Sequence, residues 1–267
     1  MTVFQQPLIF LCTGQDFIMM LKEHLFTFFE EKACRTTVDQ LCIGLGYTAV
    51  STTDGGIGIA YSYFDTKNAC MMLNHYDNPE GRPATGLLGK IFSKNPLEKS
   101  MALAAINALN FDATRDLRAE PDNRILLDNL GIGTGTRVAM VGAFKPLINV
   151  IEQRGADLSV YDMGNRIGDK NRFYDRLNQW AQVLILTSTS LLNDTTEEIL
   201  GHTGPEARTV LLGPSTPLVP EVFAPLAVDY LAGTVPVDIE GTFRAIRHGT
   251  GTPVIQKFGR KVSIRLK

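Results

Sequence analysis

The chain has 267 residues, of which 44% are hydrophobic and 20% charged, and its formal net charge is −2. This composition is typical of a globular protein and excludes a disordered chain, and the length suits two domains of ordinary size. Because Lys and Arg do not outnumber Asp and Glu, we expect no nucleic-acid partner. Residues 7–12 form the longest early apolar stretch, which is too short to cross a membrane and follows no basic segment. We therefore expect a cytoplasmic protein without a membrane partner.

The four cysteines, Cys12, Cys34, Cys42 and Cys70, lie in the first quarter of the chain and form no Cys-x-x-Cys pair. In a cytoplasmic protein we expect them to be reduced and to pack as small hydrophobic side chains. The sequence is compatible with a homodimer and does not determine the oligomeric state.

The first 115 residues predict an α+β domain. A capping pattern at residues 13–16 indicates a helix with Phe17, Leu21, Leu25 and Phe28 on one face. β-branched and apolar runs predict strands at residues 38–43, 47–52 and 57–61, the last two joined by the Gly-rich hairpin turn at 53–56. A second helix begins after Asn95, and its alanines suggest close packing against a sheet or another helix.

Residues 116–267 predict a second, Rossmann-like domain, with the junction between residues 111 and 130. Short apolar runs predict strands at residues 138–142, 158–162, 183–187 and 209–213, and helices are expected at 146–154, 170–180 and 194–200. This alternation is typical of a parallel sheet covered on both faces. A closing hairpin of antiparallel strands is expected at residues 254–258 and 261–266.

In such sheets ligands bind beyond the carboxyl ends of the strands. Four consecutive strand ends carry glycine, hydroxyl, amide or carboxylate groups, which can donate to or coordinate a small polar ligand. The predicted ligand-binding residues are Gly142, Phe144, Lys145, Asp162, Thr187, Ser188, Asn193, Gly213, Pro214, Ser215 and Thr216.

Helix capping is the alternative explanation for polar residues after a strand, and Asn193 and Asp194 suit that role well. Helix capping alone does not explain the turn at residues 213–217, because two prolines stiffen a loop that carries two hydroxyls. We expect Ser215 and Thr216 to lie at the surface of this loop and to form the floor of the site.

A dinucleotide is not the expected ligand. Asp162 lies 20 residues after Gly142, where a ribose-binding acid lies in NAD sites, but the glycine fingerprint is absent. Phe144 and Pro146 would obstruct the approach of a pyrophosphate to the backbone, so NAD(P) is unlikely as a cofactor. The chain also contains neither a Gly-x-Ser-x-Gly elbow nor a Walker loop.

Evidence for a protein-bound metal is weak. His75 and Asp77 could supply two ligands, although an exposed polar turn is the plainer interpretation. Lys145, Arg166 and Arg82 are candidate counter-charges for an anion, and solvated surface residues are the alternative.

Several segments together resemble the bacterial and archaeal two-domain family labelled "putative heavy-metal chelation". In the first half the resemblance is carried by residues 44–50, 54–60 and the helix from Asn95 to Ala108. In the second half it is carried by residues 141–147, 186–193, 212–218 and 231–237. The resemblance implies an enolase N-terminal-like domain followed by a Rossmann-like domain, with a cleft between them, and it assigns no catalytic residue.

Three functions remain open. The first is that the protein binds or processes a metal chelate or small anionic metabolite in the interdomain cleft. The second is an enzyme with a nucleotide-type cofactor and Asp162 on the ribose, and the third is a non-catalytic sensor or carrier. Soft heavy metals favour clustered thiolate or imidazole, and this sequence clusters neither. A bound metal would therefore have oxygen ligands, a few dispersed Cys or His, or a small organic molecule already complexing it.

Overall fold

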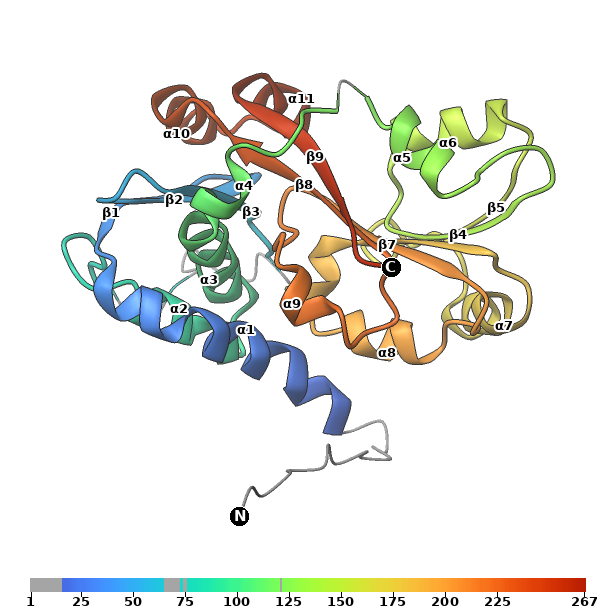
Figure 1. Ribbon diagram of the computed structural model, residues 1–267, viewed down its shortest axis with the longest axis horizontal. Coiled ribbons are helices and arrows are strands. Elements are labelled where there is room, and N and C mark those ends of the chain that lie inside the picture. Colours follow the sequence, from blue (N-terminus) through green and yellow to red (C-terminus); the bar gives the residue numbers. More distant parts are fainter. Residues whose placement is uncertain (1–15, 65–72, 74–75, 121) are drawn as a thin grey trace, which may run out of the picture.

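The computed structural model describes residues 16–64, 73, 76–120 and 122–267, and the side chains among them from residue 21 onward. It is a mixed α/β fold with two sheets, shown in Figure 1, so the predicted fold class is confirmed. The predictions about Cys12, Cys70 and His75 lie outside the described residues, and the side chain of Phe17 lies outside the described side chains. Among the described residues no helix is both long and apolar enough to cross a membrane.

The first half builds a three-stranded antiparallel sheet in the order β1-β2-β3. Its elements are α1 (Asp16–Arg35), β1 (Val38–Ile43), β2 (Tyr47–Thr52), β3 (Ile57–Tyr61), α2 (Thr85–Leu88), the 3-10 turn η1 (Gly89–Phe92), α3 (Pro96–Leu109) and α4 (Phe111–Thr114). Asn95 caps α3, since its side chain accepts a hydrogen bond from the Leu97 N–H.

The alanines of α3 allow the close packing that the sequence suggested. A side chain at Gly58 of β3 would lie 2.2 Å from the Ala104 carbonyl oxygen, so the helix backbone rests almost directly on the strand. On α1, Leu21 and Leu25 are buried as predicted, but Phe29 is buried in place of Phe28. The two phenylalanines are neighbours, and the i+4 position from Leu25 faces the core more squarely than i+3.

The second half builds a six-stranded sheet in the order β5-β4-β6-β7-β8-β9, parallel except for β9. Its first elements are α5 (Arg124–Asn129), β4 (Arg137–Val141), α6 (Lys145–Gln153), β5 (Asp157–Tyr161), α7 (Lys170–Gln179), β6 (Val183–Thr187), the 3-10 turn η2 (Ser188–Leu191) and α8 (Thr196–Gly201). The chain continues through β7 (Arg208–Leu212), α9 (Pro220–Phe223), β8 (Tyr230–Pro236), α10 (Ile239–Arg247), α11 (Thr252–Ile255), η3 (Gln256–Phe258) and β9 (Gly259–Arg265). All four predicted parallel strands are present within one residue of their expected bounds.

Alternate residues of β4 bury on opposite faces of this sheet. Val138 and Met140 pack with α5 and α6, whereas Ala139 and Val141 pack in the cluster that contains α7 and α8. Both faces are therefore covered, as expected for strands joined by helical crossovers.

The predicted closing hairpin is partly wrong. An antiparallel strand does close the sheet, but β9 pairs with β8, and residues 254–258 lie in α11 and η3. Pro253 at the start of α11 explains the difference, because proline fits the first turn of a helix and cannot donate within a sheet.

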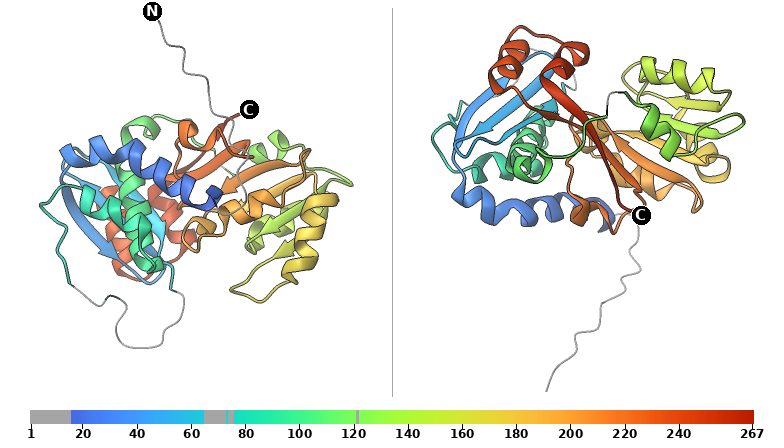
Figure 2. Two further views of the ribbon diagram at one scale, coloured as in Figure 1. Left: turned by 90° about the horizontal axis from the view of Figure 1, so that it is seen from below. Right: turned by 45° about the horizontal axis from the view of Figure 1, so that its top comes forward.

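The two halves share their hydrophobic core. α10 and α11 lie across the free face of the first sheet, where Phe243 and Ile246 pack with Tyr47 and Ile59 (Figures 1 and 2). The largest cluster likewise joins α1 and α3 to the second sheet. The chain thus returns to its first half before it adds β9 to the second sheet, and β3 lies beside the strand ends of this larger sheet.

Candidate ligand-binding site

The strand order creates a crevice at the carboxyl ends of β4 and β6. These strands are neighbours, yet α6 leaves β4 on one face of the sheet while η2 and α8 leave β6 on the other. Such a switch in crossover direction opens a space in which ligands of parallel sheets bind. Gly142 directly follows β4 and Thr187 ends β6, so two predicted site residues flank this position.

Two glycines let neighbouring loops approach closely at this edge. Gly142 has φ +90°, and a side chain there would lie 2.9 Å from the Thr187 Cβ. Gly213 has φ +144°, and a side chain there would lie 2.3 Å from the Ser188 Oγ. Only glycine adopts these backbone angles readily and leaves room for the neighbouring hydroxyl side chains.

The Asp162 carboxylate joins the loop after β4 to the loop after β5 by hydrogen bonds. It accepts hydrogen bonds from the Ala143 N–H at 2.8 Å, the Asn165 N–H at 2.8 Å and the Asn165 side-chain amide at 2.9 Å. Burial opposes ionisation of this carboxyl, but these hydrogen bonds outweigh it and hold the pKa of Asp162 below its ordinary value. Asp162 is therefore an anion whose oxygens are already engaged by its own chain.

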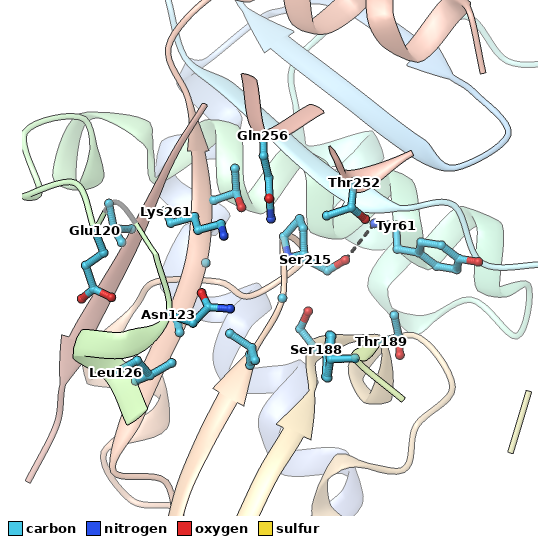
Figure 3. Close-up of a pocket in the computed structure, with 18 of the residues that line it drawn as sticks. Tyr61, Glu120, Asn123, Leu126, Ser188, Thr189, Ser215, Thr252, Gln256 and Lys261 are labelled. Atoms are coloured by element: carbon cyan, nitrogen blue, oxygen red, sulfur yellow. Dashed lines mark hydrogen bonds between the residues drawn. The ribbon is translucent and has the colours of Figure 1, made fainter. Parts of the chain in front are cut away.

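The crevice has two compartments that meet at Tyr61 and Thr189. The polar compartment, of about 440 Å³, contains Gly142, Asp162, Thr187 and Asn193 in its wall. The apolar compartment, of about 270 Å³, is shown in Figure 3 and contains Phe144, Ser188, Gly213, Pro214 and Ser215 in its wall. Nine of the eleven predicted ligand-binding residues thus line one or the other of these two adjacent compartments.

Lys145 and Thr216 lie elsewhere. Lys145 is exposed at the start of α6 and lines neither compartment. Thr216 lines a separate small cavity beside Asn110 and Thr234. The Asn193 and Asp194 side chains do not cap α8 either, because that helix begins at Thr196.

The expectation that Ser215 and Thr216 are surface hydroxyls is wrong. Ser215 is 1% exposed and Thr216 is 2% exposed. The Ser215 hydroxyl accepts a hydrogen bond of 2.8 Å from the Tyr61 N–H, which joins the loop after β7 to the end of β3. Pro214 and Pro217 stiffen a turn that connects the halves of the molecule.

Tyrosines were missed by the sequence reasoning. Tyr61, Tyr63, Tyr161 and Tyr174 line the polar compartment, and Tyr47 and Tyr61 line the apolar one. Tyr61 ended a predicted strand, but its role depends on the first sheet facing the second, which no local pattern reveals. Asn123, Gln256 and Lys261 also line the apolar compartment, and no local sequence pattern indicates this role either.

The described residues contain no group of three or more His, Cys, Asp or Glu placed to hold a metal ion. Asp77, one of the weak metal candidates, forms an exposed ion pair with Arg82 at 2.8 Å. Burial raises the pKa of the half-buried Cys42 thiol, with Arg247 opposing the shift, so this sulfur is held in its weakly ligating protonated form.

Two family models match the chain, each over a different segment. The family model DUF364, described as "Putative heavy-metal chelation", matches residues 126–265, and DUF4213, with the same description, matches residues 27–110. An uncharacterised protein of Methanocaldococcus jannaschii is 23% identical over 183 residues, which are 64% of this chain and 67% of that protein.

Two crystal structures of DUF364 proteins of unknown function share the fold. The protein from Pyrococcus horikoshii has a TM-score of 0.77 and 20% identity, covering 92% of this chain and 100% of its own. The protein from Desulfitobacterium hafniense has a TM-score of 0.75 and 21% identity, covering 94% and 99%. Since the DUF364 model matches more than half of its residues, the chain belongs to the family described as "Putative heavy-metal chelation".

Proposed function

We propose that the crevice between the two sheets binds a small molecule, either a metal chelate or a small anionic metabolite. One observation carries the proposal: two adjacent compartments lie at the carboxyl ends of β4, β6 and β7, where β3 of the first sheet borders the space. Crevices at such a switch in strand order are the usual ligand sites of open parallel sheets.

The family description is consistent with metal binding. Apart from the single thioether of Met163, the polar groups in the walls of the crevice are hydroxyls, amides, phenols, carboxylates and ammonium groups, which are poor ligands for soft heavy metals. We therefore infer that the metal arrives already complexed by a small organic molecule, and that the protein recognises the complex through its organic part.

A nucleotide held by Asp162 receives less support. The Asp162 oxygens accept three hydrogen bonds from Ala143 and Asn165, so a ribose hydroxyl would have to compete with donors that also hold two loops in place. This engaged carboxylate leaves the metal chelate and the anionic metabolite as the better-supported ligands.

The Tyr61 ring offers a direct test because it borders both compartments and is 41% exposed. Tyr61→Ala removes ring contacts while keeping the backbone N–H that donates to Ser215. Tyr76→Ala is the matched control, since Tyr76 is 93% exposed and lines neither compartment. We expect equilibrium dialysis against Ni²⁺–citrate, with metal analysis, to show retention by wild type and Tyr76→Ala and a loss of about tenfold in Tyr61→Ala.

Ni²⁺ alone and citrate alone are dialysed in parallel. Retention of free Ni²⁺ to the same extent by all three proteins would place the metal outside the crevice and contradict the proposal. Failure of wild type to retain either the complex or citrate would contradict it as well.

A further inference from the structure

One wall of the apolar compartment comes from elements that are not strand ends. Asn123 precedes α5, Gln256 lies in η3 and Lys261 lies in β9. Figure 3 shows the polar ends of these three side chains directed toward the space that the Ser188 hydroxyl faces from the opposite side. Hydrogen-bond donors from distant parts of the chain therefore face the same space.

Lys261 supplies an ammonium group that has no ion-pair partner among the described residues. Its ammonium group forms no hydrogen bond or ion pair with the described residues, whereas its carbonyl oxygen accepts from the Glu120 N–H at 2.8 Å. Glu120 is the other charged residue in this wall. Its carboxylate accepts a hydrogen bond from the Ser263 hydroxyl and lies at the edge of the compartment in Figure 3.

Most of the remaining wall is apolar and aromatic. Leu126, Phe144 and Val262 contribute hydrocarbon surface, and the Tyr47 and Tyr61 rings meet edge to face with centroids 6.1 Å apart. An occupant of this space must present an apolar body, preferably a flat ring, to these side chains. The same occupant must present an acceptor to the donors at the other end.

We propose that the apolar compartment binds a ring-bearing organic acid whose carboxylate is held by the Lys261 ammonium, with Gln256 and Asn123 completing its hydrogen bonds. This inference rests on the proposed function and specifies the organic part of the ligand. A charge-assisted hydrogen bond is favourable here because the surrounding hydrocarbon lowers the local dielectric, whereas a neutral acceptor would form a weaker hydrogen bond and leave the ammonium charge without a counter-charge.

Two matched probes test the proposal: 2-naphthoate, which carries the acid, and 2-naphthalenemethanol, which has the same ring without the charge. Isothermal titration should show that wild type binds the acid about tenfold more tightly than the alcohol. Lys261→Met should abolish this preference by weakening the acid alone, and Lys261→Arg should restore part of it. Lys257→Met removes the same charge from the exposed residue next to Gln256 and should leave both affinities unchanged.

An equal affinity of wild type for the two probes, binding of neither, or a preference that survives in Lys261→Met would overturn the inference. None of these results decides the proposed function, which stands or falls with the Tyr61→Ala dialysis against Ni²⁺–citrate. A loss in Tyr61→Ala together with indifference to Lys261 would mean that the crevice binds a chelate without an acid anchored at this wall.

Discussion

Ser215 and Thr216 are adjacent and buried, yet their hydroxyls have different partners. Ser215 accepts from the Tyr61 N–H, whereas the Thr216 Oγ1 is buried without a hydrogen-bond partner among the described residues. Ser215→Ala should therefore lower the free energy of unfolding by about 1–3 kcal/mol, because a backbone donor loses its acceptor. Thr216→Val keeps the shape of the side chain and removes an unsatisfied hydroxyl, so its effect should be neutral or stabilising. Urea denaturation checks both, and a larger loss in Thr216→Val than in Ser215→Ala would contradict this assignment.

Glu197 at the start of α8 is a buried carboxyl whose protonation affects stability. Burial is the largest cause that raises its pKa to about 7, and Asp194 adds to the shift while Lys22 opposes it. The folded state binds this proton more tightly than the unfolded state, in which the pKa is near 4.5. The contribution of Glu197 protonation to the free energy of unfolding is thus fully present below pH 4.5 and is lost as the pH rises through about 7.

Replacing Glu197 by Gln should consequently stabilise the protein at pH 8, by at most about 3 kcal/mol, and change little at pH 4.5. Glu198→Gln is the opposite control. Burial raises the pKa of Glu198, but its contacts with Lys170, Tyr174 and His202 together outweigh burial and lower it, so this substitution should destabilise slightly at pH 8. Thermal unfolding at both pH values compares the two variants, and a stabilisation by Glu197→Gln that is equal at both would show that ionisation is not the cause.

At the scale of elements, the chain's local patterns predict the strands that are bounded by clear turns. The hairpin of β2 and β3 follows from residues 53–56, and the four parallel strands follow from short apolar runs. β8 was missed because Gly233 and Pro236, which are uncommon within strands, interrupt its sequence pattern. Residues 254–258 were assigned to a strand although Pro253 indicates a helix start.

The residues of the candidate site also fall into those that a local sequence pattern predicts and those that it does not. Gly142, Thr187, Ser188 and Gly213 could be predicted because strand ends of a parallel sheet meet at one edge. Tyr61 and Lys261 could not, since their positions depend on how β3 and β9 lie against that edge. Asp162 was correctly placed at the edge, but only the structure shows that its oxygens are used to hold loops together.

At the scale of the whole molecule, the path of the chain indicates that each half depends on the other for its stability. α10 lies in the second half of the sequence but packs on β2, and a side chain at Gly44 would lie 2.4 Å from the Ile246 carbonyl oxygen. The division between residues 115 and 116 stays a prediction, and whether it also separates two folding units can be measured. Trp180, the single tryptophan, reports on the second half alone.

Ile246→Ala removes a buried side chain from the face of α10 that covers the first sheet. It should cost about 2–5 kcal/mol, and in one cooperative unit Trp180 fluorescence and far-UV circular dichroism should shift to the same lower urea midpoint. Ile239→Ala makes the same substitution at an exposed position of the same helix and should shift neither by much. If the circular dichroism transition moves while that of Trp180 stays in place, the halves unfold separately. Because the crevice is built from both halves, a single transition would also mean that a ligand bound there stabilises the entire chain.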